Sequence, residues 1–237
     1  MVAQPQPWTA ALTDDERTLL CTFPDDTERS PWMVGKDYHR RALDALEYPL
    51  RRYRDDWYVS SDLPIIYPRP NNRLGQVAPD IMVAFVHNHD RDAFDIREEG
   101  GFPPFVLEVV STESRSRDTG KDKRVRVYNL LGAREYAIFD PRAKRRPVLA
   151  GYRRAADGGW EEWPLDASGA LRSAVLDLTL AQDGMLLRLH DARGRALPTA
   201  EEDAAMLAQE RAARAAADEE LALLRAENAR LRAGGSA

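Results

Sequence analysis

The order strand, helix, strand between residues 104 and 140 constrains the fold of this chain most strongly. The runs PFVLEVVS at 104–111 and EYAIFD at 135–140 have the length and composition of buried strands. The basic segment between them is typical of a helix that ends near Leu131, with Gly132 as its C-cap. This order predicts a mixed α/β sheet flanked by helices.

Other elements are predicted on both sides of this unit. Apolar residues recur at helical spacing over about 36–53, where Pro49 is expected to kink or divide the helix. The sequence from Thr13 to Glu16 fits the capping box of a short helix. Short strand candidates over 147–190 are separated by glycine turns, and they predict antiparallel hairpins that continue one edge of the core.

Composition changes divide the chain into three parts. Residues 1–30 are expected to be a poorly ordered lead-in with a short helix, and 31–198 the globular domain. Residues 199–237 predict a long helix in which four leucines lie on a heptad grid, with Asn228 on the seam of Leu221. The grid favours a coiled coil and a homodimer through this helix, and a single exposed helix is the alternative. The leucines are Leu207, Leu221, Leu224 and Leu231.

Several classes of protein are disfavoured by composition. No run approaches the roughly 18–20 apolar residues that cross a bilayer, and the first residues lack a secretory pattern, so we expect a cytoplasmic protein without a membrane partner. One cysteine, Cys21, excludes an intramolecular disulfide and a thiolate metal site. The formal net charge is −5, yet six bases gather between Arg115 and Arg126, and such a local patch could neutralise phosphates.

Two acids lie in apolar runs of the kind that form buried strands. Asp80 lies in VAPDIMVAFV at 77–86, and Glu108 lies in the run at 104–111. Acids are depleted in strands and are rarely buried without a partner. A divalent ion such as Mg²⁺ or Mn²⁺ would explain both, with the backbone carbonyl of Val109 or of Val110 completing its shell. The alternative is that each acid caps a strand end or pairs with an arginine.

The spacing of these residues resembles that of a known family. Pro79-Asp80 followed by Glu108-x-Val110 is similar to the PD-(D/E)XK nuclease superfamily. The block from Phe105 through Arg117-Asp118 to Phe139-Asp140-Pro141 looks more narrowly like the Uma-two family of restriction-endonuclease-like proteins. The resemblance implies a restriction-endonuclease-like mixed sheet and a Mg²⁺-dependent endonuclease that hydrolyses DNA phosphodiester bonds. It implies that Asp80 and Glu108 bind the metal.

The resemblance leaves the catalytic lysine open. The superfamily's usual lysine lies two residues after the second acid, where this chain has Val110, and a lysine of the next helix is the implied substitute. Lys121 and Lys123 are both candidates, and Lys121 shares a helix face with Tyr128. The other candidates are two accessory residues, His39 and Asp118, and three phosphate-binding arginines, Arg115, Arg117 and Arg124.

Two other functions compete with cleavage. A catalytically weak or inactive protein with this fold would bind nucleic acid or a protein and oligomerise through its C-terminal helix. Val110 and the net charge of −5 favour that alternative. In the other, the helix is the main functional part and the globular domain is its scaffold.

Overall fold

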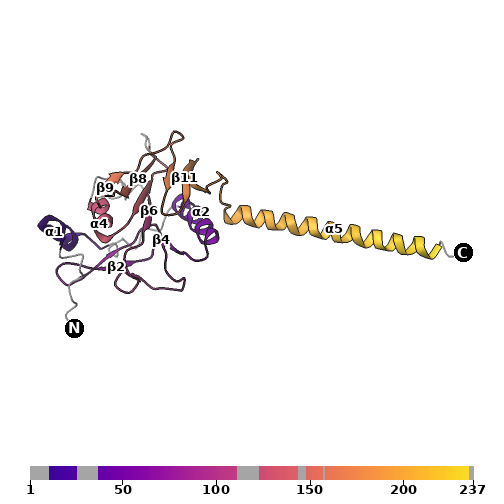
Figure 1. The fold of residues 1–237 in the computed structure, drawn as a ribbon, viewed down its shortest axis with the longest axis horizontal. Coiled ribbons are helices and arrows are strands. Elements are labelled where there is room, and N and C mark those ends of the chain that lie inside the picture. Colours follow the sequence, from indigo (N-terminus) through magenta and orange to yellow (C-terminus); the bar gives the residue numbers. More distant parts are fainter. Residues whose placement is uncertain (1–10, 26–36, 111–122, 144–147, 157, 235–237) are drawn as a thin grey trace. The chain divides into compact units, whose positions relative to one another are not determined.

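A computed structural model describes residues 11–25, 37–110, 123–143, 148–156 and 158–234 (Figure 1). The chain forms two compact units, Met1–Leu197 and Pro198–Ala237. None of the helices among the described residues is long and apolar enough to cross a membrane. The helices are α1 (Asp14–Thr22), α2 (Asp37–Tyr53), α4 (Lys123–Leu131) and α5 (Ala200–Gly234).

A six-stranded mixed sheet forms the centre of the first unit, in the order β1-β4-β6-β7-β8-β9. Strands β6 and β7 are parallel, with Val109 opposite Phe139, and the other neighbours are antiparallel. The predicted mixed α/β sheet is therefore confirmed. Its strands are β1 (Tyr58–Ser60), β4 (Ile81–Ala84), β6 (Phe105–Val109), β7 (Glu135–Phe139), β8 (Leu149–Arg154) and β9 (Trp160–Glu162).

Two three-stranded sheets accompany the central one. Strand β2 (Ile65–Pro68) lies between β3 (Leu74–Val77) and β5 (Phe94–Asp95) in one of them. Strands β10 (Leu171–Ser173), β11 (Leu178–Asp183) and β12 (Leu186–His190) form the other.

The hairpins over 147–190 follow the prediction only in part. Strands β8 and β9 extend the edge of the central sheet, as predicted, but β10, β11 and β12 form a separate sheet. The reason is burial: Leu178, Leu180 and Leu187 are buried in the same cluster as the leucines of α2. If these three strands had continued the edge of the central sheet, their apolar face would have been exposed to water.

Both faces of the sheet are covered at β4, β6 and β7, which explains why these strands are nearly continuous apolar runs. Val106 of β6 points into a cluster formed with α1, α4 and β2. Its neighbour Leu107 points into the opposite cluster, formed with α2 and the sheet of β10, β11 and β12. Figure 1 shows α1 and α4 on one side of the strands and α2 on the other.

Local sequence sets the helix ends. The capping box before α1 is confirmed, since the Thr13 hydroxyl accepts from the Glu16 N–H at 3.3 Å and the Glu16 carboxylate accepts from the Thr13 N–H at 2.8 Å. Gly132 ends α4 with a φ of 111°, a conformation that favours glycine. Helix α2 is continuous through Pro49.

The run over 77–86 is not one strand. Strand β3 ends at Val77 and β4 begins at Ile81, so Asp80 lies immediately before β4. Pro79 has no N–H to donate to a ladder, which explains the interruption.

Candidate active site

Strands β4 and β6 are neighbours in the central sheet, and they bring the two acids to the same end of the pair, with Asp80 just before β4 and Glu108 near the end of β6. Their antiparallel register places Ile81 opposite Leu107, and the next position of that register places Asp80 opposite Glu108. Asp80 is 4% exposed and Glu108 is 1% exposed. Two carboxyl groups are therefore withdrawn from solvent at neighbouring positions, an arrangement that is costly unless positive charge or hydrogen bonds accompany it.

Two donors from other parts of the fold hold Asp80. Its Oδ2 accepts a hydrogen bond of 2.6 Å from the backbone N–H of Val109, the residue after Glu108. The same oxygen lies 3.3 Å from Nε2 of His39, in the first turn of α2. The structure therefore brings Asp80, Val109 and His39 together, three residues that the sequence analysis selected.

A residue of α4, which covers the face of the central sheet opposite to α2, holds Glu108. The Tyr128 hydroxyl donates a hydrogen bond of 2.7 Å to Oε1 of Glu108. The Tyr128 side chain is fully buried and packs against Phe102 and Tyr136, so its hydroxyl has a fixed position. Tyr128 was not among the site residues predicted from the sequence, although it lies in the block that resembles the Uma-two family and shares a helix face with Lys121.

Asp140 is a third buried acid at this end of the strands, and it was not among the site residues predicted from the sequence. It directly follows β7, whose last residue Phe139 lies opposite Val109, and it is 6% exposed. One carboxylate oxygen accepts from the Arg142 N–H at 3.1 Å. The Arg142 guanidinium lies 3.8 Å from the ring centre of Tyr38, the neighbour of His39. The available sequence signal for Asp140 was its position directly after β7, the strand that pairs with β6.

The remaining candidates are only partly placed. Four of them lie outside the described residues: Arg115, Arg117, Asp118 and Lys121. Lys123 and Arg124 form the first turn of α4, but their side chains are outside the described set.

The carboxylates at this end of β4 and β6 are of a kind and number that suit Mg²⁺ or Mn²⁺. Within the described ranges no group of three or more His, Cys, Asp and Glu side chains could hold an ion by itself. Mg²⁺ usually takes only one or two carboxylates, and waters and substrate phosphates complete its shell. Asp80 and Glu108, each fixed by a hydrogen bond, fit that pattern.

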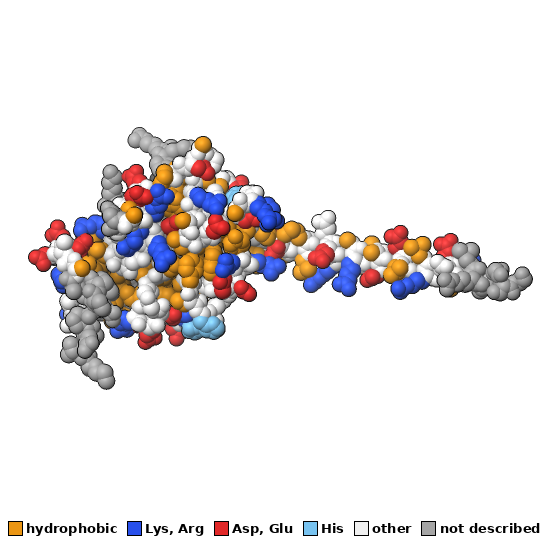
Figure 2. Space-filling model, in the orientation of Figure 1, with side chains coloured by type: hydrophobic (Ala, Val, Ile, Leu, Met, Phe, Trp, Pro, Cys, Tyr) orange, Lys and Arg blue, Asp and Glu red, His pale blue; other side chains and the backbone are white. Residues whose placement is uncertain are grey.

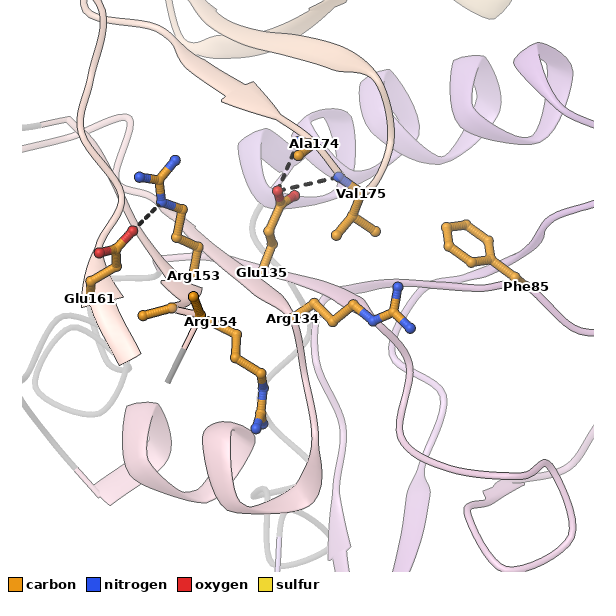
Figure 3. Close-up of a pocket in the computed structure, with 10 residues that line it drawn as sticks. Phe85, Arg134, Glu135, Arg153, Arg154, Glu161, Ala174 and Val175 are labelled. Carbon is orange, nitrogen blue, oxygen red and sulfur yellow. Dashed lines mark hydrogen bonds and ion pairs between the residues drawn. The ribbon is translucent and has the colours of Figure 1, made fainter. Parts of the chain in front are cut away.

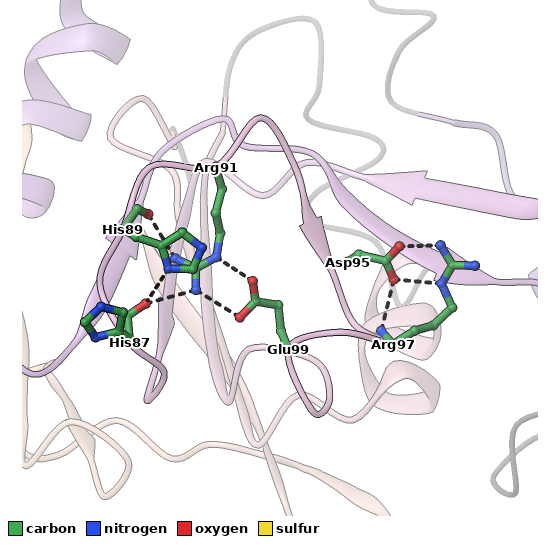
Figure 4. A network of polar contacts seen from close by, with 6 residues as sticks. All are labelled: His87, His89, Arg91, Asp95, Arg97 and Glu99. Atoms are coloured by element: carbon green, nitrogen blue, oxygen red, sulfur yellow. Dashed lines mark hydrogen bonds and ion pairs between the residues drawn. The ribbon is translucent and has the colours of Figure 1, made fainter.

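The loop after β4 contains His87 and His89, and an arginine organises it (Figure 4). Arg91 donates to both carboxylate oxygens of Glu99 and to the backbone carbonyls of both histidines. Its guanidinium lies 4.1 Å from the ring centre of Tyr58. The hydrogen bond from Arg91 holds the pKa of Glu99 below its usual range. These contacts within the protein explain the conformation of the loop.

Comparison with known proteins identifies the family. Residues 32–183 match the model of the Uma2 family, whose description is "Putative restriction endonuclease". The chain belongs to the Uma2 family. The match includes His39, Asp80, Glu108 and Tyr128, and it ends before α5 begins.

Solved structures add a distant similarity. A crystal structure from Anabaena variabilis ATCC 29413, described as "a putative nuclease belonging to DUF820", is 12% identical to this Uma2 chain. The similarity covers 60% of this chain and 74% of that one, with a TM-score of 0.44. No curated protein matches the chain.

Proposed function

We propose that this Uma2 protein is a Mg²⁺- or Mn²⁺-dependent endonuclease that hydrolyses DNA phosphodiester bonds, with residues 31–198 as the cleaving unit. The observation that carries the proposal is the buried pair Asp80 and Glu108 at the same end of the neighbouring strands β4 and β6. A family of nuclease character supports it. The experiment is plasmid nicking by the full chain, with Mg²⁺ or with EDTA. Cleavage that is unaffected by EDTA would contradict the proposal.

The carboxylates of Asp80 and Glu108 would hold the ion, with the Val109 carbonyl as a further ligand. Such an ion lowers the pKa of a bound water and stabilises the charge that develops on the phosphate. The N–H of Val109 and the Tyr128 hydroxyl keep the two carboxylates in place. His39 would position Asp80 through the 3.3 Å contact between its Nε2 and Oδ2 of Asp80, in the tautomer that has the proton on Nε2.

The basic segment before α4 and the first turn of that helix would complete the site. We propose that Lys121 or Lys123 orients the attacking water and that Asp118 is an accessory group. Arg115, Arg117 and Arg124 would contact phosphates, whose binding by arginine is sensitive to salt.

Tyr128→Phe tests the support of Glu108 without altering either acid. The variant loses one hydroxyl and keeps the ring that packs against Tyr136. Loss of a group that orients a metal ligand costs about 10- to 100-fold, and we expect that decrease in the rate of Mg²⁺-dependent nicking. Tyr53→Phe, on α2, is the control. Equal rates for Tyr128→Phe and wild type would show that this hydrogen bond has no part in cleavage.

A second candidate function rests on Val110. Valine is uncharged, so this position does not supply the superfamily's usual cation. Its side chain is 1% exposed and lies in the apolar cluster beside α4. In this alternative, the nuclease fold binds nucleic acid or a protein and cleaves weakly or not at all. DNA binding without any metal-dependent nicking would favour it over the first proposal.

We also propose that α5 forms a parallel homodimer. Leu221 and Leu224 are 45% and 52% exposed, and Figure 2 shows hydrophobic and charged side chains interspersed along this helix. On the heptad grid Leu221 and Asn228 occupy a positions and Leu224 a d position. A parallel pair places Glu220 at g opposite Arg225 at e of the second chain, whereas an antiparallel pair would oppose like charges.

Leu224→Gln tests this dimer, with Leu223→Gln as its matched control. Leu223 is more exposed, at 67%, and lies at a c position outside the seam. Each buried leucine contributes roughly 1.5–3 kcal/mol, so the loss of two per dimer should raise the Kd at least about a hundredfold. Sedimentation equilibrium measures it. A monomeric wild type, or an equal effect of both variants, would contradict the dimer.

A further inference from the structure

A separate pocket of about 770 Å³ lies at the amino end of β7, the opposite end of that strand from Asp140 (Figure 3). It is lined by the start of β7, the end of β8, the turn after β10 and the exposed ring of Phe85. The five residues of β7 span about 13 Å at 3.3 Å per residue, so the pocket is distinct from the acid pair.

The two acids that line the pocket are already engaged. The Glu135 carboxylate turns toward the turn after β10, where it accepts from the Ser173 hydroxyl and from the N–H groups of Ala174 and Val175 at 2.8 and 3.3 Å. Glu161 accepts from Arg153 at 2.6 Å. Neither carboxylate neutralises the other two arginines.

Those two arginines have no acidic partner among the described residues. The Arg154 guanidinium donates to carbonyl oxygens, that of Asn129 at 2.6 Å and those of Ala133 and Gly158 at 3.3 and 3.4 Å. The guanidinium of Arg134 makes no hydrogen bond or ion pair within the described residues. Burial, and then the charge of Arg134, lower the pKa of Arg154. An anion in the pocket would relieve this repulsion.

An aromatic surface lies beside Arg134. Phe85 is 48% exposed, and its ring packs against the buried Trp57 with 5.7 Å between ring centres. In Figure 3 the Arg134 side chain extends toward Phe85. A guanidinium next to a supported, exposed ring offers one contact to a phosphate and one to a planar base.

We propose that this pocket binds a nucleotide, with its phosphate on Arg134 and its base stacked on Phe85. The volume is within the range of small-ligand sites, and alanines and Val175 form an uncharged wall. The nucleotide is either free or one unit of a DNA strand. The second case rests on the proposed function, whereas the pocket's affinity for a nucleotide does not.

Fluorescence anisotropy of a labelled single-stranded oligonucleotide tests the proposal, with the full chain in EDTA so that no cleavage occurs. We expect Arg134→Glu and Phe85→Ala each to weaken binding about tenfold, and Arg134→Glu to lower the salt slope by about 1. Arg172→Glu and Leu74→Ala are the matched controls, since both residues are exposed and lie outside the pocket. Arg134→Gln replaces Arg134→Glu if the charge reversal impairs folding.

Competition with deoxyadenosine monophosphate distinguishes the two sources of the nucleotide. Displacement of the oligonucleotide by the monophosphate, lost in Arg134→Glu, supports a site for free nucleotides. Pocket-dependent binding of the oligonucleotide alone supports a site for a strand. Wild-type affinity in both pocket variants, equal losses in the controls, or no binding by wild type overturns the inference. Plasmid nicking is measured in parallel: if it fails while the pocket binds, only the proposed function is overturned.

Discussion

Glu108→Gln is expected to lower Mg²⁺-dependent plasmid nicking by more than about a hundredfold while the protein stays folded. Loss of a group that merely orients a ligand costs about 10- to 100-fold, and loss of a ligand should cost more. The amide keeps the size of the side chain and an oxygen that can accept from Tyr128, but it has no negative charge to hold a divalent ion.

Two comparisons make this result specific. Asp80→Asn should cause a loss of the same order, because it removes the other carboxylate that would hold the ion. Glu99→Gln, in the loop after β5, removes an acid bound by Arg91 away from the two site carboxylates and should leave nicking within about twofold. Cleavage by Glu108→Gln at the wild-type rate would exclude Glu108 as a metal ligand.

Glu135→Ala is expected to lower the free energy of unfolding by about 3–5 kcal/mol. Glu135 is 3% exposed and connects β7 of the central sheet with the turn after β10. The change leaves the Ser173 hydroxyl and two backbone N–H groups without their acceptor, and each buried donor left unsatisfied costs about 1–3 kcal/mol. Urea unfolding followed by circular dichroism measures it.

Glu161→Ala is the control for this loss of stability. Glu161 lines the same pocket, but its ion pair with Arg153 is exposed, so we expect a change of about 1 kcal/mol or less. A loss below about 1 kcal/mol for Glu135→Ala would show that the buried carboxylate does not connect the two sheets.

The pH dependence of Glu135 has a definite sign. Burial raises the pKa of Glu135 above its ordinary value of 4.5, against the hydrogen bonds that lower it. The folded protein therefore binds this proton more tightly than the unfolded chain does. Stability relative to Glu135→Gln should be greatest below pH 4.5 and should decrease as the pH rises through the raised pKa. A difference that does not vary with pH would contradict this assignment.

The centre of the sheet could be predicted because β4, β6 and β7 are buried on both faces and are therefore almost entirely apolar. The order from Phe105 to Phe139 then indicated the parallel pair. The separate sheet of β10, β11 and β12 could not be predicted in this way. Strand periodicity indicates a buried face, but it does not indicate which surface covers that face.

The candidate site shows the same division. Asp80 and Glu108 were found because acids are unusual in apolar runs and because the surrounding block resembles the Uma2 family. The contact from Tyr128 to Glu108 spans 20 residues, and that from Val109 to Asp80 spans 29. Such contacts depend on how helices and strands pack, so local patterns do not contain them. Whether Lys121 or Lys123 completes the site stays a prediction.

Anomalous diffraction from crystals soaked in Mn²⁺ shows whether Asp80 and Glu108 share one divalent ion. We expect a single strong peak within about 2.5 Å of an oxygen of each carboxylate, and its loss in Glu108→Gln crystals. Nicking by Mn²⁺-loaded protein whose crystals show no peak at these two carboxylates would contradict a shared ion.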